Sequence, residues 1–447
     1  MSATSRFNSL KLVQTLKLKY INTDHKVLNN ILWLLFDNVA RRLIMLIVIA
    51  YTSRYLGVET FGIVNYATAL MLFFTSFANL GIKSILVKEI VKGDIKEGTL
   101  LGTSFVSMLS ASFASSLLMV FFVLVQKETV ATQYVFLMLG ITLIIQSTDI
   151  LAYYFESKVL SKYIVFSSNF SLIISSILRL CCVYFKLDIY IYASIFVVEA
   201  ILRALALLFY YYKNNKGFIK EWSFEIMLAK LLVKQSLPLM LSAIAVSIYM
   251  RIDQVMIREM IGMKSVGIYS AVTQVTGIFY FIPMSVCSSF FPKLILFRGI
   301  DKSKFKEELY KLLQKLVLLS YILIFLVLIF SKQIILTLYG MEFLEANSIL
   351  KYSIGCQLFV SIGVLQSYYL ISINKSNVLL SITIWGIIIN VILNYAFISI
   401  WGLEGSAVAM VITQFFTGYC VGFFYEQLSY FTRIATNAII FKKYLLG

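Results

Sequence analysis

The chain has 447 residues, of which 60% are hydrophobic, and its mean hydropathy is +0.87. A soluble globular protein is about 45–50% apolar, so this composition excludes a soluble fold and indicates a polytopic membrane protein. The formal net charge of +17 would suit nucleic-acid binding. Most lysines and arginines, however, lie in short segments between apolar runs, which is typical of membrane proteins with basic cytoplasmic loops. We therefore expect no nucleic-acid partner.

The cysteine and histidine content narrows the chemistry further. Five cysteines lie in or beside apolar runs, without metal-ligand or disulfide spacing. The single histidine, His25, precedes the first predicted span, and the chain has no Walker A pattern. These features exclude histidine chemistry inside the membrane and ATP hydrolysis by Walker machinery. We predict no metal, no cofactor and no enzymatic activity.

The N-terminal segment is basic and lacks the apolar core and cleavage site of a signal peptide. Phe7, Leu10, Val13 and Leu16 recur at helical spacing beside lysines. This spacing predicts a cytoplasmic amphipathic arm over 1–28 that lies on the membrane surface. A disordered basic tail is the alternative.

About twelve apolar runs are long enough to cross a bilayer as helices. Their predicted bounds are 29–53, 60–82, 101–125, 134–156, 163–185, 189–212, 236–258, 266–290, 312–331, 347–372, 377–399 and 405–428. They predict an all-α integral membrane protein with two lobes of six helices each. The predicted parts are an N-terminal lobe at 29–212, a cytoplasmic linker at 213–235, a C-terminal lobe at 236–430 and a cytoplasmic tail at 431–447.

The loops alternate between many and few basic residues. The basic set comprises the N-terminus, segments 83–98, 157–162, 213–234 and 293–315, Lys375 and the C-terminus. The other set holds only Arg54, Lys127, Lys186, Arg258, Lys264 and Lys332. Because basic loops stay in the cytoplasm, both termini are predicted to be cytoplasmic. Two basic segments, Lys83–Leu100 and Phe291–Lys315, are amphipathic and are predicted to lie as helices along the membrane surface.

A similar passage occurs once in each half of the chain. LGVETFGIVNYAT (Leu56–Thr68) and IGMKSVGIYSAVT (Ile261–Thr273) share their glycine spacing, so that Gly62 matches Gly267. Each passage follows a run that contains arginine and aspartate. With six spans in each half, the halves run in the same sense. This predicts a parallel repeat with a binding site at the interface of the halves.

Ionisable side chains within the apolar runs are the functional candidates, because a charge at mid-bilayer depth costs about 2.5–3.5 kcal/mol or more. Glu199 and Arg203 are four residues apart and can pair on one helix face, as can Asp37 and Arg41. Arg251 and Asp253 are two residues apart and cannot face each other. At least one of them must reach another helix or a cavity.

Arginine is the residue that stands out among these candidates. We predict that a cationic central cavity is lined by Arg41, Arg42, Arg179, Arg203 and Arg251. Arginine suits a phosphate ligand because its planar fork bonds two oxygens at once and stays charged. The alternative is that these side chains form structural ion pairs that hold helices together. For Glu199 and Arg203 the two interpretations weigh equally, whereas excess positive charge favours the cavity for Arg41, Arg42 and Arg251.

The repeated passages and their surroundings resemble a known family. The segments YLGVETFGIVNYA and RIDQVMIREMIGMKSVGIYSAVTQV, with the charged first span and two six-span lobes, resemble bacterial polysaccharide-export proteins. The chain is similar to the O-antigen flippase (Wzx-type) branch of the multidrug/oligosaccharidyl-lipid/polysaccharide (MOP) exporter superfamily. The similarity extends over nearly the whole chain.

The resemblance implies a MATE-like, V-shaped bundle in the bacterial cytoplasmic membrane that works by alternating access. It implies a flippase that moves an undecaprenyl-pyrophosphate-linked oligosaccharide, a repeat unit of O-antigen or capsule, to the periplasmic leaflet. The arginines would hold the pyrophosphate and sugar, with the lipid tail in a lateral groove. The candidates for coupling to a proton or sodium gradient are Asp37, Asp149, Glu199 and Asp253.

The resemblance also bears on partners and leaves other functions open. Membrane lipid and the lipid-linked oligosaccharide are implied partners, and a polysaccharide polymerase and a chain-length regulator are further candidates. A small-molecule antiporter of the multidrug branch would favour an acidic cavity for cationic drugs. A polymerase would be an enzyme with a large external loop, whereas the longest predicted outer loop runs only from Ser331 to Glu345.

Overall fold

The computed structural model of the chain describes residues 41–42, 44–214 and 221–442. The predicted amphipathic arm and Asp37 therefore lie outside the described residues. Every regular element in the part of the chain that the structure describes is helical. This confirms the all-α fold predicted from hydropathy.

The helices follow the predicted apolar runs closely. In the first half a helix over 44–78 precedes α2 (Ile82–Lys92), α3 (Glu97–Val125), α4 (Val130–Ile145), η1 (Gln146–Asp149), α5 (Ile150–Ser157), α6 (Ser161–Tyr184) and α7 (Ile189–Asn214). In the second half come α8 (Ile226–Met260), α9 (Met263–Ile300), α10 (Lys302–Leu338), η3 (Met341–Phe343), α11 (Ala346–Ser353), α12 (Cys356–Ser372), α13 (Ser376–Trp401), α14 (Leu403–Gly418), η4 (Cys420–Phe423) and α15 (Glu426–Ile439).

Ten helices in the described part are long and apolar enough to cross a membrane, or eleven if α11 and α12, bent by 43°, form one span. The first of them, Ile44–Lys92, contains a reversal at Gly57, where φ is +70°. Arg41 and Met71 lie on either side of this reversal, yet both line the same cavity. A continuous helix would separate them by about 45 Å, at 1.5 Å per residue. This stretch therefore holds both of the first two predicted spans.

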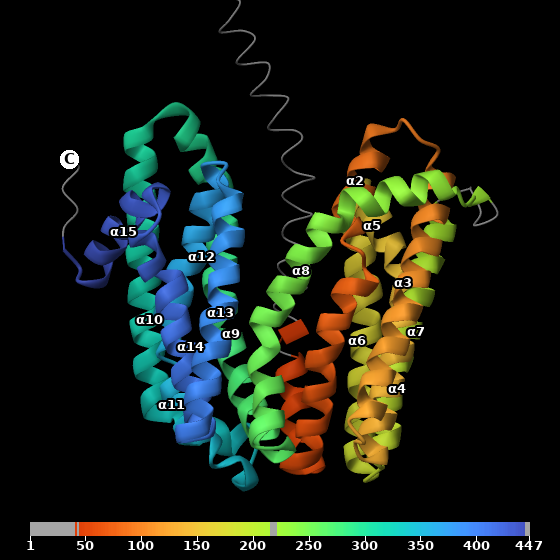
Figure 1. Cartoon of the computed structure of the whole chain (residues 1–447), viewed down its shortest axis with the longest axis horizontal. Helices are drawn as coiled ribbons and strands as arrows, with labels where there is room; N and C mark the ends of the chain where they lie inside the picture. Colours follow the sequence, from red (N-terminus) through yellow and green to blue (C-terminus); the bar gives the residue numbers. More distant parts are fainter. Residues whose placement is uncertain (1–40, 43, 215–220, 443–447) are drawn as a thin grey trace, which may run out of the picture.

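The helices form two groups that meet at one end and diverge toward the other, which gives the molecule the expected V shape (Figure 1). The helix over 44–78 and α2–α7 make the first lobe, and α9–α15 make the second. Helix α8 crosses between them, because it packs on α2 and α3 near its start and on α13 further along. The precise domain boundaries drawn from the sequence stay predictions.

The two sets of loops lie at opposite ends of the molecule. Tyr55 donates a hydrogen bond to the carbonyl oxygen of Leu187 at the end where the lobes meet, which we call the closed end. At the other end Lys83 pairs with Glu156 at 2.9 Å and Lys158 pairs with Glu97. We call this the basic end because it holds the loops that are rich in lysine. The separation agrees with the predicted alternation of the loops, while the orientation in a membrane stays a prediction.

Two segments at the basic end differ from their predicted form. The segment Phe291–Lys315 is not a separate surface helix, because α9 continues to Ile300 and α10 begins at Lys302. The Asp301 carboxylate accepts hydrogen bonds from the backbone amides at the start of α10, at 2.9 and 3.1 Å, and so permits a new helix to begin at once. Helix α15 crosses the predicted boundary between lobe and tail at residue 430, with its apolar face packed on α10 and α12.

Two matching glycines join the lobes at the closed end. A Cβ atom on Gly62 would overlap the carbonyl oxygen of Met263, and one on Gly267 would overlap the carbonyl oxygen of Val58. The backbones of the helix over 44–78 and of α9 are therefore in direct contact. Small residues permit such close approach between membrane helices, where lipid supplies no hydrophobic driving force. The repeated passages thus meet each other across the junction of the lobes.

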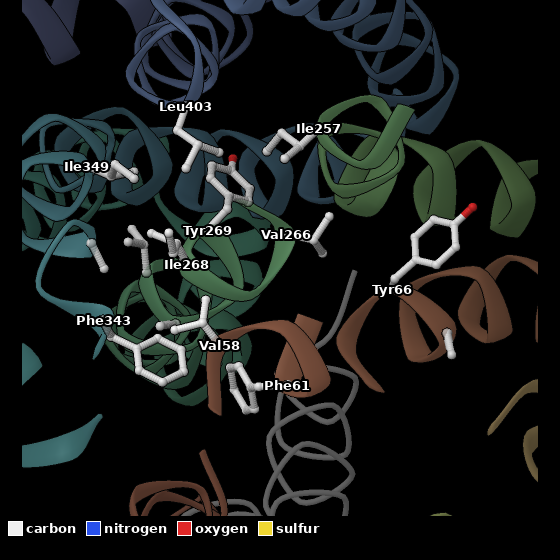
Figure 2. Close-up of a cluster of buried hydrophobic side chains, with 14 of the residues drawn as sticks. Val58, Phe61, Tyr66, Ile257, Val266, Ile268, Tyr269, Phe343, Ile349 and Leu403 are labelled. Atoms are coloured by element: carbon white, nitrogen blue, oxygen red, sulfur yellow. The ribbon is translucent and has the colours of Figure 1, made fainter. Parts of the chain in front are cut away.

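Aromatic side chains surround this glycine contact. Phe61 from the first lobe packs edge-on against Phe343 and Tyr339 from the second, with ring centroids 5.6 and 6.1 Å apart. Figure 2 shows Val58 and Phe61 beside Phe343, within one buried cluster that draws on both lobes. The closed end is therefore a packed apolar core shared by the two halves of the chain.

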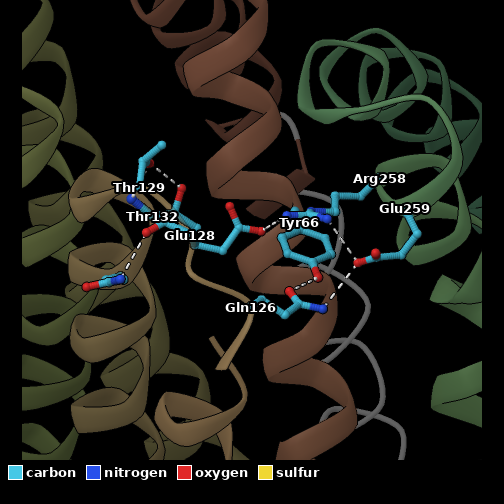
Figure 3. Close-up of polar contacts among 8 residues, drawn as sticks. Tyr66, Gln126, Glu128, Thr129, Thr132, Arg258 and Glu259 are labelled. Carbon is cyan, nitrogen blue, oxygen red and sulfur yellow. Dashed lines mark hydrogen bonds and ion pairs between the residues drawn. The ribbon is translucent and has the colours of Figure 1, made fainter. Parts of the chain in front are cut away.

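A polar network links the first lobe to the end of α8 beside this core (Figure 3). Arg258, near the end of α8, pairs with Glu128 from the loop after α3 and with Glu259 at 3.2 Å. Gln126 donates a hydrogen bond to Glu259 at 3.2 Å and accepts one from the Tyr66 hydroxyl at 3.3 Å. The Glu128 side chain is only 8% exposed, so its charge depends on the arginine for compensation.

We expect Gly267→Ala to lower thermal stability, because the new methyl group would force two backbones apart. Overpacking of this kind costs about 1–3 kcal/mol. The matched control is Gly277→Ala on the same helix, where a Cβ would meet nothing within 4 Å. Thermal unfolding of the purified protein in detergent measures the difference. Equal melting temperatures for the two variants would show that the glycine contact does not hold the lobes.

The Arg258–Glu128 pair should behave as a coupled unit. Arg258→Glu or Glu128→Arg alone leaves like charges together, and the double exchange should recover most of the loss, with a coupling energy of about 0.5–3 kcal/mol. Thermal unfolding of all four combinations measures this energy. Lys264→Glu, at an exposed position of the same end, is the control and should have little effect. Additive single effects would contradict the link.

Candidate functional site

A charged cavity of about 510 Å³ lies deep in the first lobe. Among the described residues its walls come from Arg41, the helix over 44–78, α4, η1, α6 and α7, with Arg251 on α8 and Gln274 on α9 from the second half of the chain. The sequence repeat predicts a binding site at the interface of the halves. The observed cavity is instead asymmetric, since α8 and α9 close one side of a chamber that belongs mainly to the first lobe.

Polar side chains close the cavity toward the closed end. Gln274 donates a hydrogen bond to the Asn65 side chain at 2.8 Å and accepts one from the Tyr339 hydroxyl at 3.2 Å. These three residues tie the two lobes together beneath the cavity. Sequence reasoning did not single out Asn65 or Gln274. The signal available was their position, since one lies inside a repeated passage and the other directly follows the second passage.

A break in the fourth predicted span shapes one wall. The run predicted over 134–156 is interrupted by the 3₁₀ turn η1 between α4 and α5. Gln146, Thr148 and Asp149 of this turn all line the cavity. Irregular backbone is tolerated at membrane depth where it lines a polar cavity, and 3₁₀ stretches within helices often mark functional positions. The signal for this break in the sequence is QSTD, a run of four polar residues within a mostly apolar stretch.

Two of the predicted arginines are held in ion pairs between helices. Arg203 pairs with Asp149 at 3.2 Å, and Arg179 pairs with Glu199 at 2.8 Å. The pair expected within α7, Glu199 with Arg203, is not the one formed. Although these residues share a helix face, Glu199 points toward α6 and Arg203 toward η1. Glu199 pairs with Arg179 on α6 and Arg203 pairs with Asp149 on η1, because these partners are better placed than Glu199 and Arg203 are for each other.

The two pairs differ in how strongly they bind their arginine. Arg179 is only 8% exposed, also contacts the Ser175 hydroxyl at 3.4 Å, and lies 4.9 Å from the centre of the Phe196 ring. It is fixed in place and acts as a helix-to-helix tie. Arg203 is 33% exposed in its side chain, so its guanidinium remains within reach of a ligand in the cavity.

The other three arginines belong to the first predicted span and to α8. Arg41 and Arg251 both line the cavity. Within the described residues Arg251 forms no hydrogen bond and no ion pair. Arg42 points into a neighbouring pocket of about 240 Å³ that Arg251 also lines, donates to the carbonyl oxygen of Gly277 at 3.2 Å and lies 4.5 Å from the centre of the Phe281 ring. Arg251 therefore connects the two spaces.

The cavity carries a surplus of positive charge. Among the described residues its lining includes four arginines, Arg41, Arg179, Arg203 and Arg251, but only two carboxylates, Asp149 and Glu199. Arg251 has no ion-pair partner among the described residues, and an uncompensated charge in a membrane interior is costly, so an anionic ligand near Arg251 would relieve that cost. The described residues include no group of three metal-binding side chains.

Asp253 faces away from the cavity. The residue is 9% exposed, and its carboxylate accepts a hydrogen bond from the Tyr269 hydroxyl at 2.5 Å and one from the backbone amide of Gln254 at 2.8 Å. Close to it along α13 and α14, Asn394 accepts from Ser406 at 2.8 Å. The structure thus agrees with the prediction that Arg251 and Asp253 cannot share a face. One lines the cavity, and the other lies in a buried polar cluster of the second lobe.

Comparison with known sequences places this geometry in a family. A sequence model described as "Polysaccharide biosynthesis protein" matches residues 27–295, and one described as MatE matches residues 238–396. A capsular polysaccharide biosynthesis protein, CapF, from Staphylococcus aureus is 26% identical over 43% of this chain and 49% of its own length. A probable low-salt glycan biosynthesis flippase, Agl15, from Haloferax volcanii is 24% identical over 38% of this chain and 37% of its own length. The alignments thus span half or less of these relatives.

Solved structures share the fold over most of the chain. A multidrug resistance MATE transporter of the MOP superfamily, in an inward-facing conformation, has a TM-score of 0.71 at 14% identity and covers 89% of this chain and 95% of its own. The lipid II flippase MurJ, in an inward closed conformation, has a TM-score of 0.68 at 16% identity and covers 92% of this chain and 91% of its own. The first sequence model matches residues 27–295, which is more than half of this chain. The chain therefore belongs to the polysaccharide biosynthesis protein family.

Proposed function

We propose that this protein is a flippase that moves an undecaprenyl-pyrophosphate-linked oligosaccharide across the bacterial cytoplasmic membrane. The observation that carries the proposal is the surplus of arginine in a membrane-embedded cavity. The planar guanidinium group bonds two phosphate oxygens at once and keeps its charge. Membership in a polysaccharide biosynthesis family and similarity to glycan-related relatives support this choice of anion.

The five arginines have different roles in this proposal. Arg41 and Arg251 contact the diphosphate directly, and Arg42 assists from the neighbouring pocket. Arg203 joins them when the ligand competes with Asp149 for its guanidinium. Arg179, buried against Glu199, keeps the wall rigid and adds a long-range positive charge.

Transport requires the closed end to open. In the proposed orientation the basic end and both termini face the cytoplasm, where the basic loops are retained, and the closed end faces the periplasm. Opening breaks the glycine contact and the Arg258–Glu128 link while the lobes close at the basic end. A polysaccharide polymerase and a chain-length regulator would act on the delivered repeat unit, as O-antigen or as capsule.

An ion gradient can drive this cycle through a buried carboxylate. Asp253 is the strongest candidate, because it lies in the polar cluster of the second lobe and does not compete for the substrate. Asp149 and Glu199 are alternatives that would bind a proton when phosphate displaces them from their arginines. Protonation of Asp253 would weaken the hydrogen bond that its carboxylate accepts from the Tyr269 hydroxyl, and so loosen the packing of α8 against α9.

A multidrug antiporter is the second candidate function. The match of the MatE model to residues 238–396 favours it. The positive surplus of the cavity opposes it, because cationic drugs would be repelled. Drug resistance that appears on overproduction and survives Arg251→Gln would favour the antiporter over the flippase.

Arg251→Gln should strongly reduce surface polysaccharide in a host strain that lacks the native gene. Loss of a charge-assisted pair of hydrogen bonds is worth about 1.5–3 kcal/mol, or about 10–150-fold in affinity. Arg433→Gln, at an exposed position of α15, is the control and should support normal export. Equal export by both variants, at equal protein levels in the membrane, would contradict the phosphate cavity.

Asp253→Asn should remove the dependence of transport on an ion gradient, because the amide cannot bind or release a proton. Lipid-linked sugar translocation in proteoliposomes, with an imposed proton or sodium gradient, measures this dependence. Asp94→Asn, in an exposed loop, should respond to the gradient as the native protein does. An undiminished response in Asp253→Asn would exclude Asp253 as the coupling residue.

A further inference from the structure

An apolar pocket of about 420 Å³ lies beside η1 in the first lobe, separate from the charged cavity. Its walls come from α3, α7, η1 with the start of α5, and residues 222–224, which lead into α8. Its volume falls within the range of about 300–1,000 Å³ that is usual for ligand pockets. Among the described residues its lining includes no charged side chain. The pocket therefore favours a different ligand chemistry from the arginine site.

The segment 221–225, which we call the strap, closes one side of this pocket. It lies directly against the backbone of α3, because a Cβ atom on Gly102 would be 2.6 Å from the carbonyl oxygen of Ser223. The Thr103 hydroxyl accepts a hydrogen bond from the backbone amide of Glu225 at 3.1 Å. These contacts fix the strap on the first lobe, so that the pocket has a defined wall at this side.

Aromatic side chains and a lysine form a layer beside the strap. Trp222 packs against Phe105 and Tyr211, with ring centroids 5.6 and 6.0 Å apart, and its indole N–H donates a hydrogen bond to the Tyr211 hydroxyl at 3.2 Å. Tyr154 packs against Tyr211 at 5.3 Å, and the Lys158 ammonium lies 5.6 Å from the centre of its ring. We call these five residues the aromatic belt. Such side chains gather where hydrocarbon meets lipid headgroups, so the belt indicates the membrane surface at the strap.

The pocket opens toward lipid between α3 and α7. Val106 on α3 lines the pocket and is 38% exposed. Leu109 and Leu205, on the same two helices, are also exposed. Because lipid tails are as apolar as leucine, acyl chains cover these surfaces in a membrane. One such chain can enter the pocket directly from the bilayer.

The polar groups of the lining do not favour water in the pocket. Thr148 donates its hydroxyl hydrogen to the carbonyl oxygen of Ile145 at 2.8 Å, and the Ser223 hydroxyl lies 2.9 Å from that of Thr99. Both groups are thus already engaged, whereas a buried water needs 2–4 polar partners. An empty space of this size would forfeit dispersion contacts along its walls. Hydrocarbon is the filling that this lining favours.

We propose that the pocket binds one acyl chain of a membrane phospholipid whose headgroup lies at the aromatic belt. The lipid phosphate is anionic and finds a lysine at that level, as is common for phospholipid sites between membrane helices. This phospholipid is a resident of the fold and is not the transported molecule. The proposal does not depend on the proposed function, because the pocket and the strap belong to the first lobe whatever the protein carries.

The bound chain supports one wall of the charged cavity. Thr148 lines both the pocket and the cavity, so the η1 turn is the partition between them. The next residue, Asp149, pairs with Arg203 on the cavity side at 3.2 Å. A chain packed behind η1 therefore keeps this turn, and with it the Asp149–Arg203 pair, in place.

Quenching of tryptophan fluorescence tests the site. The chain has four tryptophans, and replacement of three of them by phenylalanine leaves Trp222 alone or, as the control, Trp385, which is 51% exposed on α13. The full chain, freed of lipid in detergent, is titrated with a phosphatidylglycerol whose acyl chains carry bromine, which quenches an indole on contact. We expect saturable quenching of Trp222 and at least threefold weaker, unsaturated quenching of Trp385. Equal, unsaturated quenching of both would mean ordinary contact with lipid and would overturn the proposal.

A matched pair of variants shows whether the chain lies inside the pocket. Leu208→Phe narrows the pocket, whereas Leu205→Phe changes an exposed position of the same helix outside the lining. In the protein that retains Trp222 alone, the first variant should weaken quenching at least threefold and the second should leave it unchanged. Unchanged quenching in both variants would place the lipid outside the pocket and overturn the proposal.

Hydrogen exchange tests the support of η1. Backbone amides over 146–151 should exchange more slowly when unbrominated phosphatidylglycerol is added to the lipid-free native chain, and this slowing should be lost in Leu208→Phe. No slowing in the native chain would contradict the proposed support. Neither measurement requires transport or a diphosphate ligand, so the result is independent of the flippase function.

Discussion

The direct contact between two glycines at the closed end sets the arrangement of the whole molecule. Gly62 and Gly267 bring the backbones of the helix over 44–78 and of α9 together, closer than any side chain would allow. Lipid provides no hydrophobic force between helices, so close packing must supply the attraction. This contact brings Phe61 against Phe343 and sets the floor of the cavity above it. From this junction the lobes diverge toward the basic end.

The low polarity of the membrane interior divides the arginines into two kinds. Arg179 and Arg203 reach carboxylates on neighbouring helices, and those pairs hold α6, α7 and η1 together. Arg251 reaches none among the described residues but lines both the charged cavity and the neighbouring pocket. An uncompensated charge at this depth has an unfavourable free energy. Binding of an anionic ligand would offset that free energy.

Helix α8 explains how a duplicated sequence produces an asymmetric site. It begins against the first lobe and ends against the second. Because successive residues point in different directions, Arg251 enters the cavity of the first lobe while Asp253 turns into the polar cluster of the second. One helix thus contacts both the proposed substrate site and the proposed ion site. A movement of α8 would therefore change the geometry of both sites.

The sequence by itself determined the membrane class, nearly every span, the alternation of the loops and the repeat that contains Gly62 and Gly267. It also showed that the side chains of Arg251 and Asp253 must point in different directions. Only the tertiary structure decided that Glu199 pairs with Arg179 instead of Arg203, and that a 3₁₀ turn carries Asp149 into the cavity. Hydropathy and helical period are properties of neighbouring residues in the chain, whereas the partner of a charged side chain depends on which helices pack beside it.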